Sequence, residues 1–144
     1  MIPAQLHAGE VVADTILPEI SLAMSFHKVA MTAFSTWDFF PGHHDPSYAQ
    51  SQGQKDIYLN TLALQGFADR VVTDWAGPAT FIARRRMVMK ASVYAGDTLT
   101  AGGKVIAVDD DGSRIRLAIW LRTQAAPVVD VETTIILPNR TPHS

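Results

Sequence analysis

A long helix is predicted over residues 56–75, and it limits the folds that this chain can adopt. Its apolar side chains recur at the spacing of one helical face, and they belong to Leu64, Phe67, Ala68, Val71, Val72 and Trp75. Asp56 or Asn60 can cap the start of this helix, and Ala76-Gly77-Pro78 ends it. Because the apolar face is broad, we expect other elements to enclose the helix rather than leave it on a surface.

The chain that follows this helix alternates between apolar and polar residues, which predicts strands. We expect four of them, over residues 81–93, 98–108, 114–122 and 128–137. The run Asp109-Asp110-Asp111-Gly112 is a strong signal for a hairpin between the second and the third. One long helix packed on an antiparallel sheet is an α+β fold.

Two details of these strands do not follow from alternation alone. In the first strand an apolar face is expected from Phe81, Ala83, Met87 and Met89. Arg85 falls on that same face, and the sequence offers no reason for it. In the second strand Gly102-Gly103 indicates a β-bulge, because glycine inside a strand weakens the regular ladder.

Upstream of the long helix, the pattern predicts one strand and one shorter helix. The strand is expected over residues 11–17 and the helix over residues 21–36. That helix would deliver Asp38 just beyond its C-terminal end. Residues 41–55 are rich in Gly, Gln, Ser and Pro, and we interpret them as a loop at the rim of a site.

Length and composition limit the class of protein. At 144 residues we expect a single domain over residues 1–144, and 47% hydrophobic with 18% charged residues excludes a disordered chain. A net charge of −2 gives no reason to expect nucleic acid or an anionic membrane as partner. The sequence has no cysteine, no bilayer-length apolar run and no signal-peptide pattern at its start, so we expect a cytoplasmic protein.

One stretch, residues 37–45, gathers a carboxylate and imidazoles beside aromatic residues. Asp38 and His43 stand five positions apart, with Pro41 and Gly42 between them. Proline breaks the helical path and glycine permits a sharp reversal, so the two side chains can converge. A converging carboxylate and imidazole can hold a water and transfer protons, and the neighbouring aromatic rings could wall them from solvent. The alternative is that a His-His pair in a loop is simply solvated surface.

A resemblance favours the first interpretation. Asp38-x-x-Pro41-x-His43, followed by Ala49, resembles the hydratase motif of the MaoC-like (R)-specific enoyl-CoA hydratases. Phe40 stands where that family usually has asparagine before the proline. Residues 93–99 are similar to the family's Val-x-x-Gly-Asp-x-Leu turn. The resemblance implies the hotdog fold, in which an antiparallel sheet wraps around one long central helix.

A narrower resemblance is carried by residues 43–45, 55–60 and 72–78. These stretches are similar to the small MaoC-like subunit of bacterial steroid side-chain enoyl-CoA hydratases. It implies an acyl-CoA thioester substrate, with a steroid as a candidate acyl group. It also implies a homodimer, or a heteromer with a second MaoC-like chain. Coenzyme A is part of the substrate, and no separate cofactor is implied.

The resemblance assigns roles to three residues. It makes Asp38 and His43 the catalytic pair. Asn60 stands where the family has a glycine at the start of the central helix, whose backbone N–H polarises the thioester carbonyl. The alternative for Asn60 is a helix cap only. His44 and Asp45 are expected to be structural, and we expect no metal, because adjacent histidines do not readily chelate one ion together with Asp38.

Two other functions stay open at this point. A hotdog thioesterase would direct water at the thioester carbonyl with a carboxylate and would not need the Asp-x-x-Pro-x-His pattern. A non-catalytic hotdog subunit would only complete the pocket of a partner. The intact pair of Asp38 and His43 favours hydratase over both.

Overall fold

The computed structural model describes residues 4–140, and the domain expected over residues 1–144 extends past them at both ends. In chain order the elements are β1 (Ile16–Ala23), α1 (Phe26–Ser35), η1 (Pro41–His43), α2 (Pro46–Ser51), α3 (Thr61–Ala76), β2 (Phe81–Met89), β3 (Thr98–Val108), β4 (Arg114–Arg122) and β5 (Pro127–Ile136). No helix in this described part of the chain has the length and the apolar run that crossing a bilayer requires.

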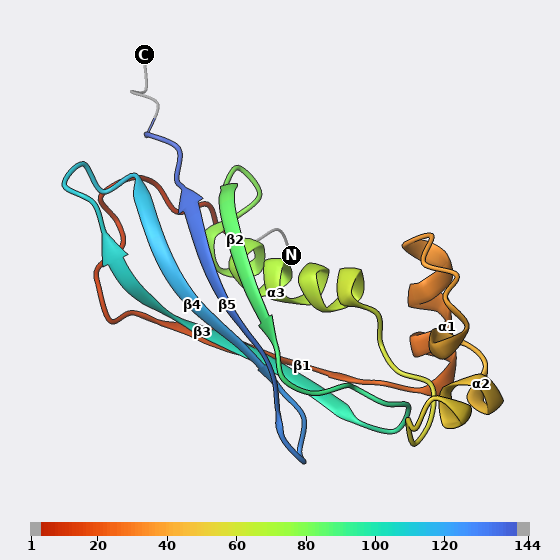
Figure 1. The fold of residues 1–144 in the computed structure, drawn as a ribbon. Helices are drawn as coiled ribbons and strands as arrows, with labels where there is room; N and C mark the ends of the chain where they lie inside the picture. Colours follow the sequence, from red (N-terminus) through yellow and green to blue (C-terminus); the bar gives the residue numbers. More distant parts are fainter. Residues whose placement is uncertain (1–3, 141–144) are drawn as a thin grey trace.

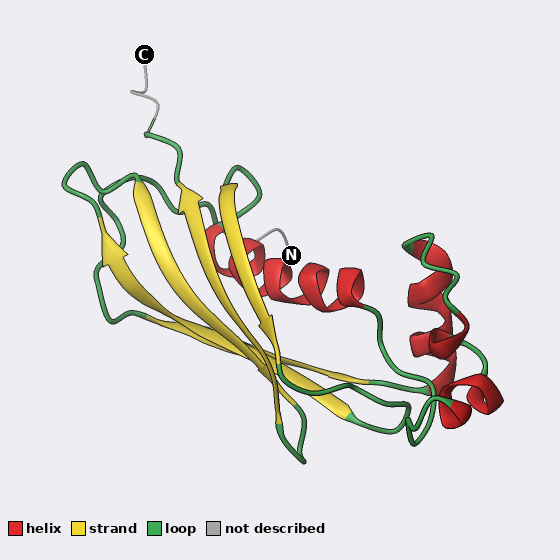
Figure 2. Cartoon of the chain, viewed as in Figure 1, coloured by secondary structure: helices red, strands yellow, loops and turns green. Residues whose placement is uncertain are grey.

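The strands form one antiparallel sheet that curls around α3. Their order is β1-β3-β4-β5-β2, so the two edges of the sheet are β1 and β2. α3 lies in the concave face, while α1, η1 and α2 gather beyond the end of the sheet, near the start of α3 (Figures 1 and 2). This is the hotdog fold, and the expected α+β architecture is confirmed.

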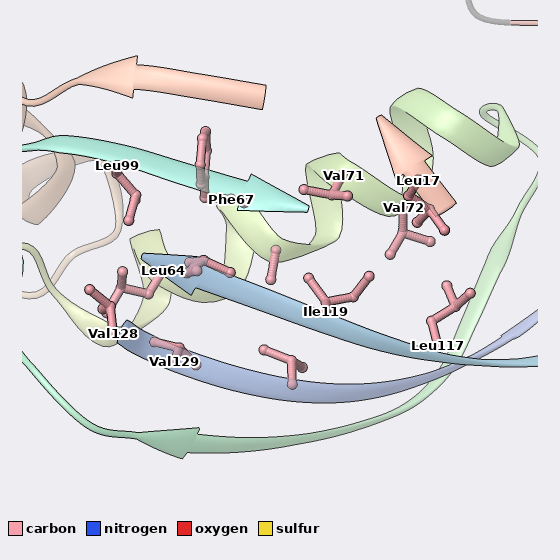
Figure 3. Packing of buried hydrophobic residues seen from close by; sticks show 14 of the residues in the cluster. Leu17, Leu64, Phe67, Val71, Val72, Leu99, Leu117, Ile119, Val128 and Val129 are labelled. Carbon is pink, nitrogen blue, oxygen red and sulfur yellow. The ribbon is translucent and has the colours of Figure 1, made fainter. Parts of the chain in front are cut away.

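The hydrophobic core lies between α3 and the inner face of the sheet (Figure 3). β4 alternates as expected, and its inward side chains are Ile115, Leu117, Ile119 and Leu121. They meet the buried face of α3, which includes Leu64, Phe67, Val71 and Val72. The broad apolar face of the helix is therefore covered as predicted, but the expected full enclosure is wrong, because Leu62, Gly66, Arg70 and Asp74 on its other side are exposed.

All three elements expected before β2 start later along the chain than predicted, and α1 begins at Phe26 rather than at residue 21. α3 begins at Thr61 rather than at residue 56, because Asn60 takes the N-cap and the residues before it are extended. The first strand begins at Ile16 and not at residue 11. Asp14 has a left-handed φ of +67°, which turns the chain just before it enters the sheet.

The carboxylate of Asp69 on α3 explains the arginine on the apolar face of β2. The ladder between β2 and β5 shifts register between Ile82 and Arg84, and a shift of one residue exchanges the two faces. Beyond the bulge, Arg85 lies opposite the buried Thr133 and reaches the α3 carboxylate Asp69, with Nη1 3.0 Å from Oδ2. The expected apolar face is therefore confirmed for Met87 and Met89, which share the inward face with Arg85, and wrong for Phe81, which lies before the bulge and faces the other way.

Gly102 and Gly103 make space for cross-strand packing, and the irregularity expected here lies in the ladder with β1, which shifts register between Leu17 and Ile20 opposite Gly103 and Ala101. They pair in regular register with Trp120 and Ile119 of β4. A Cβ on Gly102 would lie 2.4 Å from Trp120 Cζ2, and one on Gly103 would lie 2.4 Å from Ile119 Cδ1. The irregularity in the ladder with β4 lies further along β3.

Candidate active site

Asp38 is placed by the way α1 ends. Trp37 has a φ of +57°, and the N–H groups of Trp37 and Asp38 donate back to the carbonyls of Phe34 and Ala33 at 3.3 and 2.9 Å. This is the Schellman motif, whose left-handed position is usually glycine. A tryptophan there carries strain, because its Cβ crowds the backbone. The motif holds Asp38 immediately beyond the helix, where the sequence predicts it.

His43 is buried at the end of the short turn η1. Pro41 starts this turn, and the His43 N–H donates to the carbonyl of Phe40 at 3.1 Å. Gly42 is required by packing, because an added Cβ would lie 2.7 Å from Phe40 Cε1 and 2.8 Å from Tyr58 Oη. Its φ is not in the left-handed region, so the sharp reversal expected of Gly42 is not its role.

The carboxylate and the imidazole meet. His43 Nε2 lies 3.3 Å from Asp38 Oδ2, and His43 Nδ1 lies 2.7 Å from the carbonyl oxygen of Tyr58. A carbonyl only accepts hydrogen bonds, so Nδ1 carries the proton in the neutral ring and Nε2 faces Asp38 as an acceptor. Two facing acceptors can each take a hydrogen bond from one water molecule, or share a proton between them. The geometry therefore suits proton transfer at a bound water.

The site is open on one side. The His43 side chain is 9% exposed and the Asp38 side chain is 32% exposed. Of the aromatic residues expected to wall the pair, Phe40 packs edge-on against the His43 ring with 5.5 Å between centroids. Trp37 and Phe39 lie largely in solvent, 82% and 50% exposed, and for these two the expectation was wrong.

The neighbouring His44 and Asp45 have structural contacts. Asp45 is the N-cap of α2, where its Oδ1 accepts the N–H of Tyr48 at 3.1 Å. The His44 ring lies 5.5 Å from the Phe34 ring, and its Nε2 is 3.2 Å from the carbonyl of Phe39. These contacts fix the loop that carries His43.

Asn60 ties the start of α3 to the end of α1. It is fully buried, its Oδ1 accepts the N–H of Ala63 at 2.8 Å, and its Nδ2 donates to Thr36 Oγ1. The capping role is thus present, and both ends of the side-chain amide are occupied. For the backbone N–H of Asn60 the structure records no acceptor among residues 4–140.

Tyr58 belongs to the site although no sequence pattern indicates it. Its carbonyl orients His43, and its ring meets the imidazole edge to face at 4.9 Å between centroids. Burial raises the pKa of the Tyr58 hydroxyl, and the charge of Asp38 adds to that effect. The orienting group is a backbone carbonyl, which every residue has, so residue type carries no signal for it.

An apolar groove runs beside the pair, between α1, β1 and α3. It consists of two adjoining hollows of about 290 and 370 Å³, which share Leu22, Met24 and Thr32. Thr36, Leu59 and Ala63 bring the first hollow up to the cap of α3. Gly66 lies in its lining, and an added Cβ there would meet no atom within 4 Å. Apolar hollows of this size can hold a small hydrophobic group.

A carboxylate and an oriented imidazole beside the start of the central helix define a hotdog protein equipped for acid–base chemistry on water. Among the described residues, no three His, Cys, Asp or Glu side chains gather as a metal site would need.

Comparison with known proteins places the chain within this class. No protein-family model matches it. It is 41% identical over 99 residues to the 3-oxo-4,17-pregnadiene-20-carboxyl-CoA hydratase beta subunit of Mycobacterium tuberculosis, covering 69% of this chain and 77% of that one. It is 24% identical over 136 residues to the (R)-specific enoyl-CoA hydratase of Rhodospirillum rubrum, covering 94% of each chain.

A solved structure agrees with these relatives. A chain of the ChsH1–ChsH2 complex from Mycobacterium tuberculosis superimposes with a TM-score of 0.84 at 35% identity, covering 88% of this chain and 98% of that chain. The protein described here belongs to the MaoC-like (R)-specific enoyl-CoA hydratase family.

Proposed function

We propose that this chain is an enoyl-CoA hydratase that adds water to a trans-2-enoyl-CoA and forms a (R)-3-hydroxyacyl-CoA. The observation that carries the proposal is the contact between His43 Nε2 and Asp38 Oδ2 at 3.3 Å, with the imidazole fixed by the Tyr58 carbonyl. The alternative of a thioesterase needs no such pair, and the names of the relatives favour hydration.

The reaction uses the pair as base and acid. A water bound between Asp38 and His43 gives one proton to one of the two groups as its oxygen bonds to C3. The other group, which carries the proton that the pair shares, gives that proton to C2, and the proton taken from water then crosses the 3.3 Å contact to the group that acted as the acid. The net change is addition of one water, so the proposed route needs neither a metal nor a separate cofactor.

The start of α3 supports the thioester oxygen. As C3 is attacked, negative charge develops on that oxygen, and free N–H groups at a helix N-terminus stabilise such charge. Asn60 contributes its backbone N–H here, while its side chain keeps α3 and α1 in place.

The acyl group that we propose is polycyclic, like the steroid in the name of the Mycobacterium tuberculosis relative. The apolar groove between α1, β1 and α3 supports a hydrophobic acyl group. We further propose that the enzyme works in the cytoplasm as a heteromer with a second MaoC-like chain. Two observations support a partner: the relative is a beta subunit, and the exposed Trp37 and Phe39 leave the catalytic pair open on one side.

The decisive experiment replaces the pair and compares it with a matched neighbour. Asp38→Asn and His43→Ala should each lower the hydration rate by on the order of 10²–10⁴ with the fold intact, because each removes a positioned acid or base. Asp45→Asn is the control, since it sits in the same loop and an asparagine still caps α2. Rates are measured on steroid and short-chain enoyl-CoA, with the chain alone and with its partner.

Two results would contradict this function. Near-normal hydration by Asp38→Asn or His43→Ala would remove the pair from the mechanism. Release of free coenzyme A from a saturated acyl-CoA, at a rate that exceeds hydration, would make the chain a thioesterase instead.

A further inference from the structure

The turn of residues 94–97, which leads into β3, holds a buried carboxylate. Gly96 has a φ of +95°, a value that favours glycine, and the Asp97 N–H donates to the carbonyl of Tyr94 at 3.1 Å. Asp97 is only 7% exposed, although it is an acidic residue in a turn. Burying a carboxylate is costly unless its oxygens accept hydrogen bonds, so this side chain needs partners within the fold.

Both oxygens of the Asp97 carboxylate accept a hydrogen bond. Oδ2 accepts the N–H of Tyr94 at 2.9 Å, which closes the turn, and Oδ1 accepts Nε2 of Gln124 at 3.2 Å. The orientation of the Gln124 amide is fixed, because its Oε1 accepts the N–H of Thr98 at 3.0 Å. Lys55 Nζ lies 4.0 Å from Oδ1 of Asp97. The carboxylate therefore ties the turn to the loop between β4 and β5, and this arrangement needs an acceptor at both of its oxygens.

One side of this turn holds the segment that orients His43. Residues 57–59 pair antiparallel with residues 93–95, through backbone hydrogen bonds of 2.8 and 3.4 Å on either side of Tyr58. Tyr58 itself lies opposite Tyr94, the first residue of the turn. The Tyr58 carbonyl is the group that meets His43 Nδ1 at 2.7 Å. The position of the turn therefore sets the position of the carbonyl that orients the imidazole.

The other side of the turn holds the chain where it enters α1. The Gly96 N–H donates to the Met24 carbonyl at 2.6 Å, and the Met24 N–H donates to the Asp97 carbonyl at 2.8 Å. Met24 directly precedes Ser25, the N-cap of α1. Asp38 lies just beyond the C-terminal end of this helix, so its place depends on where the helix starts. The same turn is thus the common anchor of both arms of the proposed catalytic pair.

We infer that Asp97 is a positioning residue for the proposed catalytic pair. Its carboxylate fixes the turn of residues 94–97, and the turn places the imidazole of His43 through the Tyr58 carbonyl and places Asp38 through α1. Asp97 acts through the backbone and not by contact with the reacting atoms. Its effect on rate rests on the proposed hydratase function, whereas the state of the imidazole can be measured without turnover.

Asp97→Asn tests whether the carboxylate itself is needed. The amide has nearly the same shape, but its NH2 group then faces either the Tyr94 N–H or Gln124 Nε2, which are both donors. We expect kcat for hydration to fall by about tenfold or more with KM nearly unchanged, because small displacements of reacting groups lower the rate. With the ring neutral, nitrogen NMR of His43 should show loss of the Nδ1–H tautomer, because the Tyr58 carbonyl no longer fixes it.

The double variant Asp97→Asn/Gln124→Glu exchanges donor and acceptor between the two side chains. The new amide donates to the new carboxylate, which also accepts the N–H of Thr98, and the amide oxygen accepts the N–H of Tyr94. The double variant should therefore recover most of kcat and the Nδ1–H tautomer. Gln124→Glu alone sets two carboxylates against each other and should be impaired like Asp97→Asn, so the comparison holds even where one single variant fails to fold.

Asp111→Asn is the matched control, because Asp111 Oδ1 accepts the N–H of Ser113 at 2.7 Å in the hairpin at the other end of β3, away from α1 and α2 (Figure 1). Both readouts should stay unchanged in this variant. Unaltered kcat and tautomer in Asp97→Asn, a double variant no better than Asp97→Asn, or an equal loss in Asp111→Asn overturns the inference. An unaltered chain that hydrates no enoyl-CoA contradicts the proposed function only, and the tautomer comparison then decides whether Asp97 positions His43.

Discussion

The side chain of Asn60 joins two helices at the site. We expect Asn60→Ala to lower the free energy of unfolding by about 1–3 kcal/mol, because it removes both a helix cap and a buried hydrogen bond. Ser25→Ala is the matched control, since Ser25 caps α1 from an exposed position and makes no link to another element. Urea denaturation measures both. An Asn60→Ala protein no less stable than Ser25→Ala would show that the link to Thr36 contributes nothing.

The sequence reveals the reactive side chains better than it reveals what places them. Asp38 and His43 stand out as residue types in a loop, and the structure brings them together. The left-handed backbone conformation of Trp37 could not be predicted in the same way. The Schellman hydrogen bonds at the end of α1 hold it there, against the preference of tryptophan itself. The Tyr58 carbonyl comes from an extended segment that no local pattern aims at His43.

The contact between α3 and β2 makes stability depend on pH. Burial raises the pKa of Asp69 above 3.8, the ordinary value, and the charge of Arg85 opposes this without cancelling it. A carboxyl whose pKa is higher in the folded state than in the unfolded state makes the folded protein bind more protons in the window just above 3.8. The protonated carboxyl of Asp69 therefore contributes fully to stability below that window, and this contribution is lost as pH rises through the folded-state pKa.

Replacing Asp69 removes this titration. We compare the free energy of unfolding of the unaltered protein with that of Asp69→Asn. The first minus the second should decline as pH rises through the window above 3.8. Urea denaturation over a series of pH values measures it. Asp74→Asn is the control, since Asp74 lies on the exposed side of the same helix and pairs with Arg70. A difference that stays flat or grows with pH would contradict the assigned shift.

The strands that follow β2 were predicted well although their ladders also contain register shifts, whereas β2 was not. β3, β4 and β5 match the alternation to within a residue at most ends, because the acidic hairpin and the apolar period both fix their register. β2 ends earlier than expected, and its two faces exchange at a bulge. A bulge is set by the partner strand, so the sequence of β2 alone does not reveal it.

The apolar groove lies between α1, β1 and α3. A larger side chain in this groove tests whether the acyl group binds there. Gly66→Leu should raise the KM for a steroid enoyl-CoA by about tenfold and leave a short-chain enoyl-CoA nearly unchanged, because the new side chain takes space that only the larger acyl group needs. Gly66→Ala is the control and should stabilise the helix by about 0.5–1 kcal/mol. Equal changes in KM for both substrates would place the acyl group elsewhere.

The proposed catalytic pair lies within one short loop, while the sheet and α3 form the body of the protein. In a duplicated gene, a few changes in that loop would erase the chemistry and leave the body able to fold and to associate. A copy that loses the pair in this way can change its other residues to fit the acyl group, as long as the second copy keeps Asp38 and His43. Because the reactive groups occupy so few positions, two chains that descend from one ancestor can separate these roles. One chain then carries the acid–base pair, and the other shapes the pocket for the acyl group.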